Sequence, residues 1–188
     1  GILLGSSTDT DDAMGEIIYT SNLKKEKEEV EIELKKFIGK SMQNPPHFSA
    51  LKHKGKALYK YAREGVLISK PPREINIYSI KNINIEKDMC VCDIHCSKGT
   101  YIRSIARDLG ERLGTGAHLA SLTRLSQGIF NIENAFHLDE LNENSIINIE
   151  NAFLNLNEIS LTKDETKLFL NGVRFDFNID KDALYRLY

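Results

Sequence analysis

The pattern of apolar and polar positions along the chain predicts a mixture of strands and helices. Residues 1–20 hold two short apolar runs around a polar turn, which is typical of a hairpin. Residues 74–86 are rich in isoleucine and residues 89–97 alternate between apolar and polar side chains, so both segments predict strands. In residues 22–38 and 101–113 the apolar side chains recur three and four positions apart, which predicts two amphipathic helices. The predicted fold class is therefore mixed α/β (α+β).

The same spacing gives the side chains that these helices are expected to bury. They are Val30, Leu34, Phe37 and Ile38 in the first helix, and Ile102, Ile105, Ala106, Leu109 and Leu113 in the second. Residues 56–64 predict a short helix with a basic face made of Lys56, Lys60 and Arg63. Residues 118–130 predict another short helix followed by a strand, and the acidic, Asn-rich residues 137–168 predict a helix and a connection.

Composition places the chain among globular proteins of ordinary size. Its 188 residues suffice for one domain, or one domain with a small appendage, and 41% hydrophobic with 28% charged residues is typical of that class. No apolar run approaches the roughly 18 residues that a membrane span needs, so we expect no membrane-spanning segment. The cysteines all lie within residues 90–96, which favours a reducing compartment over a disulfide framework.

The first residue is Gly1, and the chain enters directly on a strand-like run, ILLG, so we treat the sequence as a fragment. A targeting segment would precede this residue. We expect a cytoplasmic protein, and an organelle stays open as the alternative.

Charge is distributed unevenly, although the net charge is only −2. Residues 47–73 hold seven Lys or Arg and one Glu, whereas residues 131–168 hold eight acidic residues and two lysines. The basic segment also interleaves its cations with Phe48, Tyr59 and Tyr61. Because cations neutralise phosphates and aromatic rings stack on bases, this segment favours nucleic-acid binding. The alternative is a solvated, lysine-rich surface.

Two motifs that suggest metal ions are better explained without them. Cys90, Cys92 and Cys96 have the wrong spacing for a paired zinc knuckle, and alternation puts all three on one strand face, where small buried side chains are expected. The run DTDDAMG lacks the acidic residue that a calcium loop needs at its twelfth position, since Thr20 stands there. We interpret this run as a polar hairpin turn, with a ligand-facing turn as the alternative.

Arg103 is distinctive on the second long helix because no acidic residue lies three or four positions away from it. Arg107, by contrast, has Glu111 four positions on, and Arg112 has Asp108 four positions back, so each can form a local ion pair. The partner of Arg103 is therefore expected elsewhere in the fold, in a ligand, or in water.

Tyr101 lies two positions before Arg103, at the mouth of a helix whose other face is apolar. Both side chains are therefore predicted to reach a common cleft near the edge of the sheet. The alternative is a tyrosine and an arginine on an ordinary surface.

Several segments resemble one known family in the expected order. The longest, HCSKGTYIRSIARDLGERLGTGAH, is similar to the signature of the bacterial-type (B-type) tRNA pseudouridine-55 synthases, and FSALKHKGKALYKYAREG to the RNA-gripping thumb of that family. Two shorter matches are STDTDDAMG and LTRLSQGIF. The resemblance covers residues 3–138, and a later segment, LTKDETKLFLNGV, looks like the start of the family's small C-terminal RNA-binding domain.

This resemblance implies a pseudouridine synthase fold, in which a mixed, largely antiparallel sheet is flanked by helices. Residues 1–158 are then expected to form a partial catalytic domain, with the thumb segment at residues 46–73. Residues 159–188 are expected to form the start of a PUA-like RNA-binding domain.

The resemblance also implies an isomerase that converts the TΨC-loop uridine of tRNA (position 55) into pseudouridine, with no cofactor or metal. The base must first leave its stack, and RNA contacts have to offset that cost. The matching active-site positions of the family are Arg103, Tyr101 and, beside the target base, the apolar Leu122. The expected RNA-binding positions are Asp12, Lys52, Lys98 and Arg124 by motif, and Lys54, Lys56, Lys60 and Arg63 by the basic character of the thumb segment.

The nucleophilic aspartate of the family belongs to a Gly-x-Leu-Asp-x-x-Ala-x-Gly motif, which this sequence does not contain. Its only Leu-Asp pair, Leu138-Asp139, is not followed by Ala-x-Gly. The acidic partner of Arg103 is then expected outside this chain, and we expect the chain alone to be inactive. The alternative is a tRNA-binding or tRNA-folding module without chemistry. In both cases we expect the TΨC stem-loop of tRNA as the partner and a monomeric protein.

Overall fold

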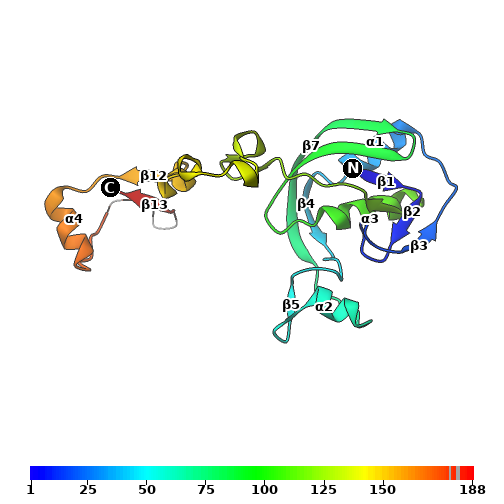
Figure 1. Ribbon diagram of the computed structural model, residues 1–188, viewed down its shortest axis with the longest axis horizontal. Coiled ribbons are helices and arrows are strands. Elements are labelled where there is room, and N and C mark those ends of the chain that lie inside the picture. Colours follow the sequence, from blue (N-terminus) through cyan, green and yellow to red (C-terminus); the bar gives the residue numbers. More distant parts are fainter. Residues whose placement is uncertain (178, 181–182) are drawn as a thin grey trace. The chain divides into compact units, whose positions relative to one another are not determined.

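The computed structural model describes residues 1–177, 179–180 and 183–188 and divides the chain into two units, Gly1–Leu122 and Thr123–Tyr188 (Figure 1). The boundary predicted at residue 158 lies inside the second unit, and it stays a prediction about the whole protein. None of the helices that the described residues form is long and apolar enough to cross a membrane.

A five-stranded antiparallel sheet forms the centre of the first unit. Its strands lie in the order β4 (Gly39–Gln43), β7 (Arg73–Glu86), β8 (Met89–Cys96), β1 (Ile2–Leu4) and β9 (Ala117–Leu119). Each strand is antiparallel to its neighbours. The two strands predicted from isoleucine content and alternation are confirmed as β7 and β8, which pair as one long hairpin.

Two helices, α1 (Lys27–Lys35) and α3 (Ile102–Leu113), pack against this sheet. The predicted apolar stripes are confirmed by the buried side chains of Val30, Leu34, Phe37, Ile105, Ala106, Leu109 and Leu113, and Ile102 packs against the same core. The prediction for Ile38 is wrong, because α1 ends before it and 46% of the residue is exposed. α1 also begins five residues later than predicted, since an earlier turn would bury no apolar side chain; Leu23 there is half exposed.

A hairpin near the N-terminus is formed by β2 (Ser6–Thr8) and β3 (Ile17–Thr20), which pair in antiparallel fashion, so the predicted hairpin is confirmed in its second arm and wrong in its first. Its first residues do not belong to the hairpin, because β1 turns away from β2 and enters the main sheet between β8 and β9. Gly5 separates β1 from β2 with a φ of +92°, a conformation that glycine adopts readily. The acidic turn (residues 9–16) connects β2 to β3.

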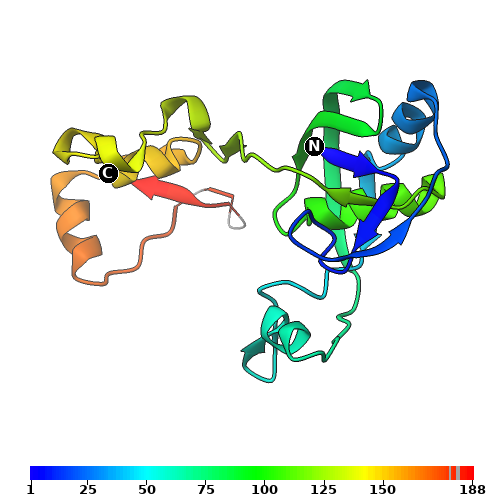
Figure 2. The same cartoon turned by 45° about the vertical axis from the view of Figure 1, so that its right-hand side comes forward.

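The thumb segment leaves the sheet between β4 and β7 (Figure 2). It contains a two-stranded hairpin, β5 (Lys52–His53) and β6 (Lys56–Ala57), followed by α2 (Leu58–Arg63). The short helix predicted here is confirmed as α2, although Lys56 belongs to β6. Leu58 and Ala62 are buried, so α2 turns its apolar side inward and leaves Lys60 and Arg63 exposed.

The short helix predicted within residues 118–130 is wrong. The segment contains the end of β9 and a hairpin of β10 (Ser126–Gln127) and β11 (Phe130–Asn131). After β9, the backbone N–H of Ala120 donates to the carbonyl of Gly1 at 2.8 Å. Hydrogen bonds to the distant Gly1, just before β1, therefore replace the ones that a helix would make.

The second unit consists of short elements. Its first part contains turns of 3₁₀ helix, namely η1 (Ile132–Asn134), η2 (Leu138–Glu140), η3 (Glu143–Ser145) and η4 (Ile149–Phe153). β12 (Asn157–Ile159) then pairs in parallel with β13 (Tyr185–Leu187), and α4 (Lys163–Leu170) comes between them in the chain. The helix predicted within residues 137–168 is thus found only at the end of that range, as α4.

The cysteines lie on β8 with their side chains towards the core. Cys90 is fully buried, Cys92 and Cys96 pack against the same apolar cluster, and all three are free thiols. The prediction that they pack as small apolar side chains is confirmed. The described residues contain no group of three or more His, Cys, Asp or Glu side chains placed to hold a metal ion.

Candidate functional site

The acidic turn lies against α3 and is fixed by its own hydrogen bonds. Thr10 Oγ1 donates to a carboxylate oxygen of Asp12 at 2.8 Å. The backbone N–H of Ala13 donates to the carbonyl of Leu119 at 2.9 Å, which ties the turn to β9. Asp11 has a φ of +63°, a left-handed conformation that Asp adopts more readily than most non-glycine residues. The turn therefore holds its aspartates in a defined geometry.

Arg103 extends from the first turn of α3 to the acidic turn and the thumb segment. Its Nη1 donates to a carboxylate oxygen of Asp12 at 2.9 Å and to the carbonyl of Thr10 at 3.3 Å, and its Nη2 donates to the carbonyl of Phe48 at 2.7 Å. About a quarter of each charged side chain is exposed. The acidic partner of Arg103 lies elsewhere in the fold, one of the places that the spacing left open, because the fold brings Asp12 to it from 91 positions away. The nucleophilic aspartate expected from outside this chain stays a prediction.

A cavity of about 300 Å³, the Arg103 cavity, opens beside this ion pair. It is lined by Asp12, Ala13, Met14, Arg103, Leu119, Ala120, Ser121 and Leu122. Three of the predicted site residues, Arg103, Asp12 and Leu122, therefore meet at one place. Leu122 is 62% exposed, so its apolar surface is available to a ligand that enters the cavity.

Tyr101 is the N-cap residue of α3 and is held through its backbone. Its N–H donates to Oε1 of Gln43 at 2.8 Å, and Nε2 of Gln43 donates to the Tyr101 carbonyl at 3.1 Å. The Tyr101 ring lies against Arg73, with 5.2 Å between the ring centre and the guanidinium carbon. Tyr101 does not line the Arg103 cavity, so the cleft predicted to be shared by the tyrosine and Arg103 is not the one that the described residues form. Side chains two positions apart at a helix start do not face each other.

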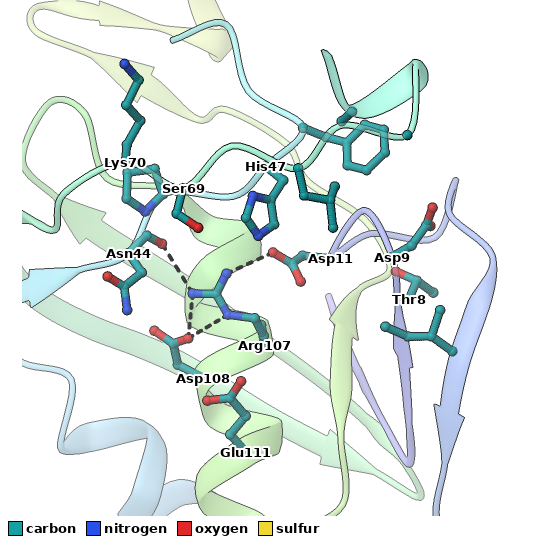
Figure 3. A pocket seen from close by; sticks show the side chains of 16 residues that line it. Thr8, Asp9, Asp11, Asn44, His47, Ser69, Lys70, Arg107, Asp108 and Glu111 are labelled. Carbon is teal, nitrogen blue, oxygen red and sulfur yellow. Dashed lines mark hydrogen bonds and ion pairs between the residues drawn. The ribbon is translucent and has the colours of Figure 1, made fainter. Parts of the chain in front are cut away.

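Arg107, one turn further along α3, forms a second ion-pair site that the sequence did not predict. Its Nη1 donates to the Asp11 carboxylate at 3.1 Å, its Nε to the Asp108 carboxylate at 2.9 Å, and its Nη2 to the Asn44 carbonyl at 3.2 Å (Figure 3). The local pairing predicted with Glu111 is wrong, because the ion pairs of Arg107 are with Asp11 and Asp108. The sequence feature that could have predicted this site is a pair of arginines four positions apart on one helix, together with two consecutive aspartates in the acidic turn.

Burial and neighbouring charges shift the pKa values of Asp11 and Arg107 in opposite directions. Burial raises the pKa of the Asp11 carboxyl above its ordinary value, although the neighbouring Arg107 guanidinium opposes the shift. Burial lowers the pKa of Arg107, but the carboxylates of Asp108 and Asp11 outweigh this effect and leave the pKa of Arg107 raised. Arg107 therefore stays charged, and it supplies the cation that pairs with the Asp11 carboxylate.

An open cavity of about 810 Å³ extends over Arg107 (Figure 3). Its walls come from the acidic turn, the thumb segment and α3. Its polar side chains include Asp9, His47, Ser69, Lys70 and Glu111. The acidic turn therefore has a cavity on each side, with Asp12 lining one and Asp11 lining the other.

The predicted RNA-binding cations of the thumb segment differ in how their charges are used. The exposed ones are Lys52, Lys54, Lys60 and Arg63. Lys56 instead forms an ion pair with Glu64, and its Nζ lies 4.6 Å from the Tyr61 ring centre. The prediction of one continuous basic face made of Lys56, Lys60 and Arg63 is therefore wrong, because an acidic partner neutralises Lys56. Two further cations are the exposed Lys98, before α3, and Arg124 in the second unit, which donates to Gln127.

Two family models match the chain one after the other. The first, described as TruB family pseudouridylate synthase (N terminal domain), matches residues 1–102. The second, described as tRNA pseudouridylate synthase B C-terminal domain, matches residues 103–158. The first match alone covers more than half of the chain.

Curated relatives named tRNA pseudouridine synthase B are similar over most of the chain. The protein of Methylobacillus flagellatus is 37% identical over 195 residues, which cover 100% of this chain and 65% of the relative. That of Francisella philomiragia is 44% identical over 197 residues with the same coverage, and that of Blochmanniella floridana is 46% identical over 155 residues, covering 78% and 61%. The chain thus spans 61–65% of the length of these relatives.

Two solved structures share the fold. A chain of the crystal structure of a Cbf5-Nop10-Gar1 complex superimposes with a TM-score of 0.66 and 20% identity, covering 99% of this chain and 54% of that one. A chain of an H/ACA RNP bound to a substrate RNA containing 2′-deoxyuridine gives a TM-score of 0.65 and 18% identity, covering 99% and 53%. At these identities the similarity concerns the fold, and it confirms the predicted fold class.

Proposed function

Because the chain belongs to the TruB family of pseudouridylate synthases, we propose that the protein containing it converts the TΨC-loop uridine of tRNA into pseudouridine. The observation that carries this proposal is the pair of adjoining family-model matches, over residues 1–102 and 103–158. It is supported by relatives named tRNA pseudouridine synthase B that are similar over most of the chain.

The proposed reaction is an isomerisation and balances without a co-reactant. The bond between N1 of uracil and C1′ of ribose breaks, the base turns, and a bond between C5 and C1′ forms. C5 loses a proton and N1 gains one, so nothing is oxidised or reduced. What the protein must supply is a nucleophile, a place for the extruded base and a fixed orientation for both.

Arg103 is suited to orient the nucleophile. Its described contacts use both N–H donors of Nη1 and one of Nη2, so two of its five donors have no acceptor among the described residues. Two donors suffice to bind an aspartate carboxylate that enters from outside these 188 residues, and the positive charge keeps that carboxylate ionised. Asp12 would then hold the other side of the same guanidinium.

The remaining predicted site residues surround this arginine with surfaces for RNA. Leu122 offers an exposed apolar side chain at the Arg103 cavity, where the face of an extruded base can pack. Tyr101 lies outside this cavity, and we assign it to the RNA surface beside Arg73. The exposed thumb cations are placed to neutralise phosphates and so to offset the unstacking of the target base.

The proposal is tested by tritium release from tRNA that contains 5-tritiated uridine. The full-length protein should release the tritium of one uridine per tRNA, and a tRNA with cytidine at the TΨC-loop target should release none. The 188-residue chain alone should bind tRNA without releasing tritium, because its sequence lacks the Gly-x-Leu-Asp motif. Release from the cytidine-substituted tRNA would contradict the target, and turnover by the chain alone would contradict the assignment of the nucleophile.

The alternative function, a tRNA-binding or tRNA-folding module, gives a different result in the same assay. It predicts that the full-length protein binds folded tRNA and prefers it to unstructured RNA, yet releases no tritium. Mass analysis of the bound tRNA does not separate the two functions, since pseudouridine and uridine have the same mass. Tritium release, which reports the exchange at C5, is therefore the deciding measurement.

A further inference from the structure

The acidic turn is attached to α3 by two ion pairs in parallel. Asp12 pairs with Arg103 at 2.9 Å, and the preceding Asp11 pairs with Arg107 at 3.1 Å. The two arginines are four positions apart, so they stand one above the other on the same face of the helix. Asp11 and Asp12 are adjacent in the chain, so a displacement of one aspartate is transmitted to the other through the peptide bond that joins them.

Arg107 also binds the place where the thumb segment begins. The carbonyl of Asn44 accepts from Nη2 of Arg107 at 3.2 Å and from Oγ of Ser104 at 3.0 Å. Arg103 binds the same segment four residues later, through the carbonyl of Phe48. Arg107 thus connects the acidic turn, α3 and the root of the thumb segment, as Figure 3 shows.

The ion pair between Asp11 and Arg107 is largely buried. Only 15% of the Asp11 side chain and 22% of the Arg107 side chain are exposed. Without its cation, the largely buried Asp11 carboxylate would lose its ion-pair partner, and the left-handed backbone of this residue would be held only by its hydrogen bonds to the Thr8 carbonyl and the Leu119 N–H. The hydrogen bonds within the turn would then hold it less firmly, and a small shift of Asp11 would move Asp12, the next residue, relative to Arg103.

We propose that Arg107 is a positioning residue: it holds the acidic turn on α3 so that Asp12 keeps the Arg103 guanidinium aimed into the Arg103 cavity. This inference rests on the proposed function, because it gives Arg107 a part in the rate of the uridine isomerisation. Arg107 itself lines the other cavity and acts on the reacting groups only through Asp11 and Asp12.

The test uses conservative variants of the full-length protein. Arg107→Lys keeps the charge but cannot reach Asp11, Asp108 and Asn44 together, and Asp11→Asn keeps the shape but removes the charge. Each should lower the single-turnover rate of tritium release at saturating tRNA by about 10- to 100-fold, since small displacements of reacting groups cost that much. The Kd for tRNA, measured by filter binding, should change by less than about threefold, because the proposal assigns no RNA contact to Arg107 or Asp11.

Arg112→Lys is the matched control. Arg112 lies on the same helix with its guanidinium over Phe37, 4.1 Å from the ring centre, away from both ion pairs. This substitution should leave rate and Kd unchanged while altering helix α3 in the same chemical way. A purely structural role for Arg107 would instead lower the melting temperature of Arg107→Lys and leave the rate of the folded fraction normal.

A double-mutant cycle with Asp12→Asn separates the two explanations further. If Arg107 acts through Asp12, the combination of Arg107→Lys and Asp12→Asn should be no more than about threefold slower than Asp12→Asn alone. Losses that multiply would overturn the proposal, and so would a normal rate for both Arg107→Lys and Asp11→Asn. If Arg107→Lys does not fold, Asp11→Asn takes its place in the cycle. An inactive wild-type protein would instead overturn the proposed function itself.

Discussion

Arg103 combines an ion pair with Asp12 and hydrogen bonds to two backbone carbonyls in one side chain. Removing it leaves the Asp12 carboxylate without its cation and the Arg103 cavity without its positive charge. We predict that Arg103→Ala in the full-length protein lowers the single-turnover rate by about 100- to 1000-fold, the usual cost of losing an oriented donor at a reacting centre. Tritium release measures the rate, and filter binding should show a nearly unchanged Kd for tRNA.

Arg112→Ala serves as the control for this prediction, because it removes the same side chain from the same helix without touching the cavity. Its rate and Kd should match those of the wild type. A near-normal rate for Arg103→Ala would make Arg103 a surface residue. A large rise in Kd would assign it to RNA binding instead of to the chemical step.

The sequence predicts Arg103, Asp12 and Leu122 as site residues but not the contact between Arg103 and Asp12 or the ion pair of Arg107 with Asp11, and the reason is physical. Local spacing shows only that no acid stands one helical turn away. The contact with Asp12 spans 91 positions and that between Arg107 and Asp11 spans 96, so only the folded chain brings these groups together. Local spacing also favoured an ion pair between Arg107 and Glu111. In the folded chain Arg107 instead pairs with Asp11, whose side chain is largely buried.

Among the elements, those with a long and regular apolar pattern were predicted well. β7, β8 and α3 each bury one face against a single core. Their apolar side chains therefore recur with the repeat of a strand or a helix, which the sequence shows directly. The segment after α3 was predicted wrongly because β9 pairs with β1, which lies more than a hundred residues earlier in the chain. Sequence patterns over a short window do not contain that partner.

The packing of α3 on β9 gives a prediction about Gly110. A Cβ added there would lie 2.1 Å from the backbone N of Ala117 and 2.4 Å from the backbone carbonyl carbon of Gly116, neither of which can move aside as a side chain can. Helix propensity alone would make Gly110→Ala stabilising by about 1 kcal/mol. We predict a net destabilisation of about 1–3 kcal/mol from overpacking, measured by urea denaturation.

Glu111→Ala is the control for Gly110→Ala. Glu111 is the next residue on α3 and is exposed, so its replacement should change the free energy of unfolding by less than about 0.5 kcal/mol. Equal stability of the two variants would mean that α3 and β9 separate easily. The close approach at Gly110 would then have no part in fixing the helix on the sheet.

For the molecule as a whole, the binding of a polyanion depends on where the charges lie and not on the net charge of −2. The cations of residues 47–73 belong to the first unit, whereas the acidic residues 131–168 belong to the second. The segment that holds these cations also contacts the site, since Nη2 of Arg103 donates to the carbonyl of Phe48. Charge, the cavity and the ion pairs therefore meet in the first unit.

The last prediction concerns the salt dependence of tRNA binding. Each exposed thumb lysine that neutralises a phosphate should contribute about 0.7–0.9 to the slope of log Kd against log salt concentration. Lys52→Gln and Lys54→Gln should each flatten the slope by that amount, whereas Lys56→Gln, the matched control in the same hairpin, should change it far less because Glu64 neutralises Lys56. Unchanged slopes for Lys52→Gln and Lys54→Gln would remove the thumb segment from the RNA interface. An equal effect of Lys56→Gln would mean that its ion pair opens when RNA binds.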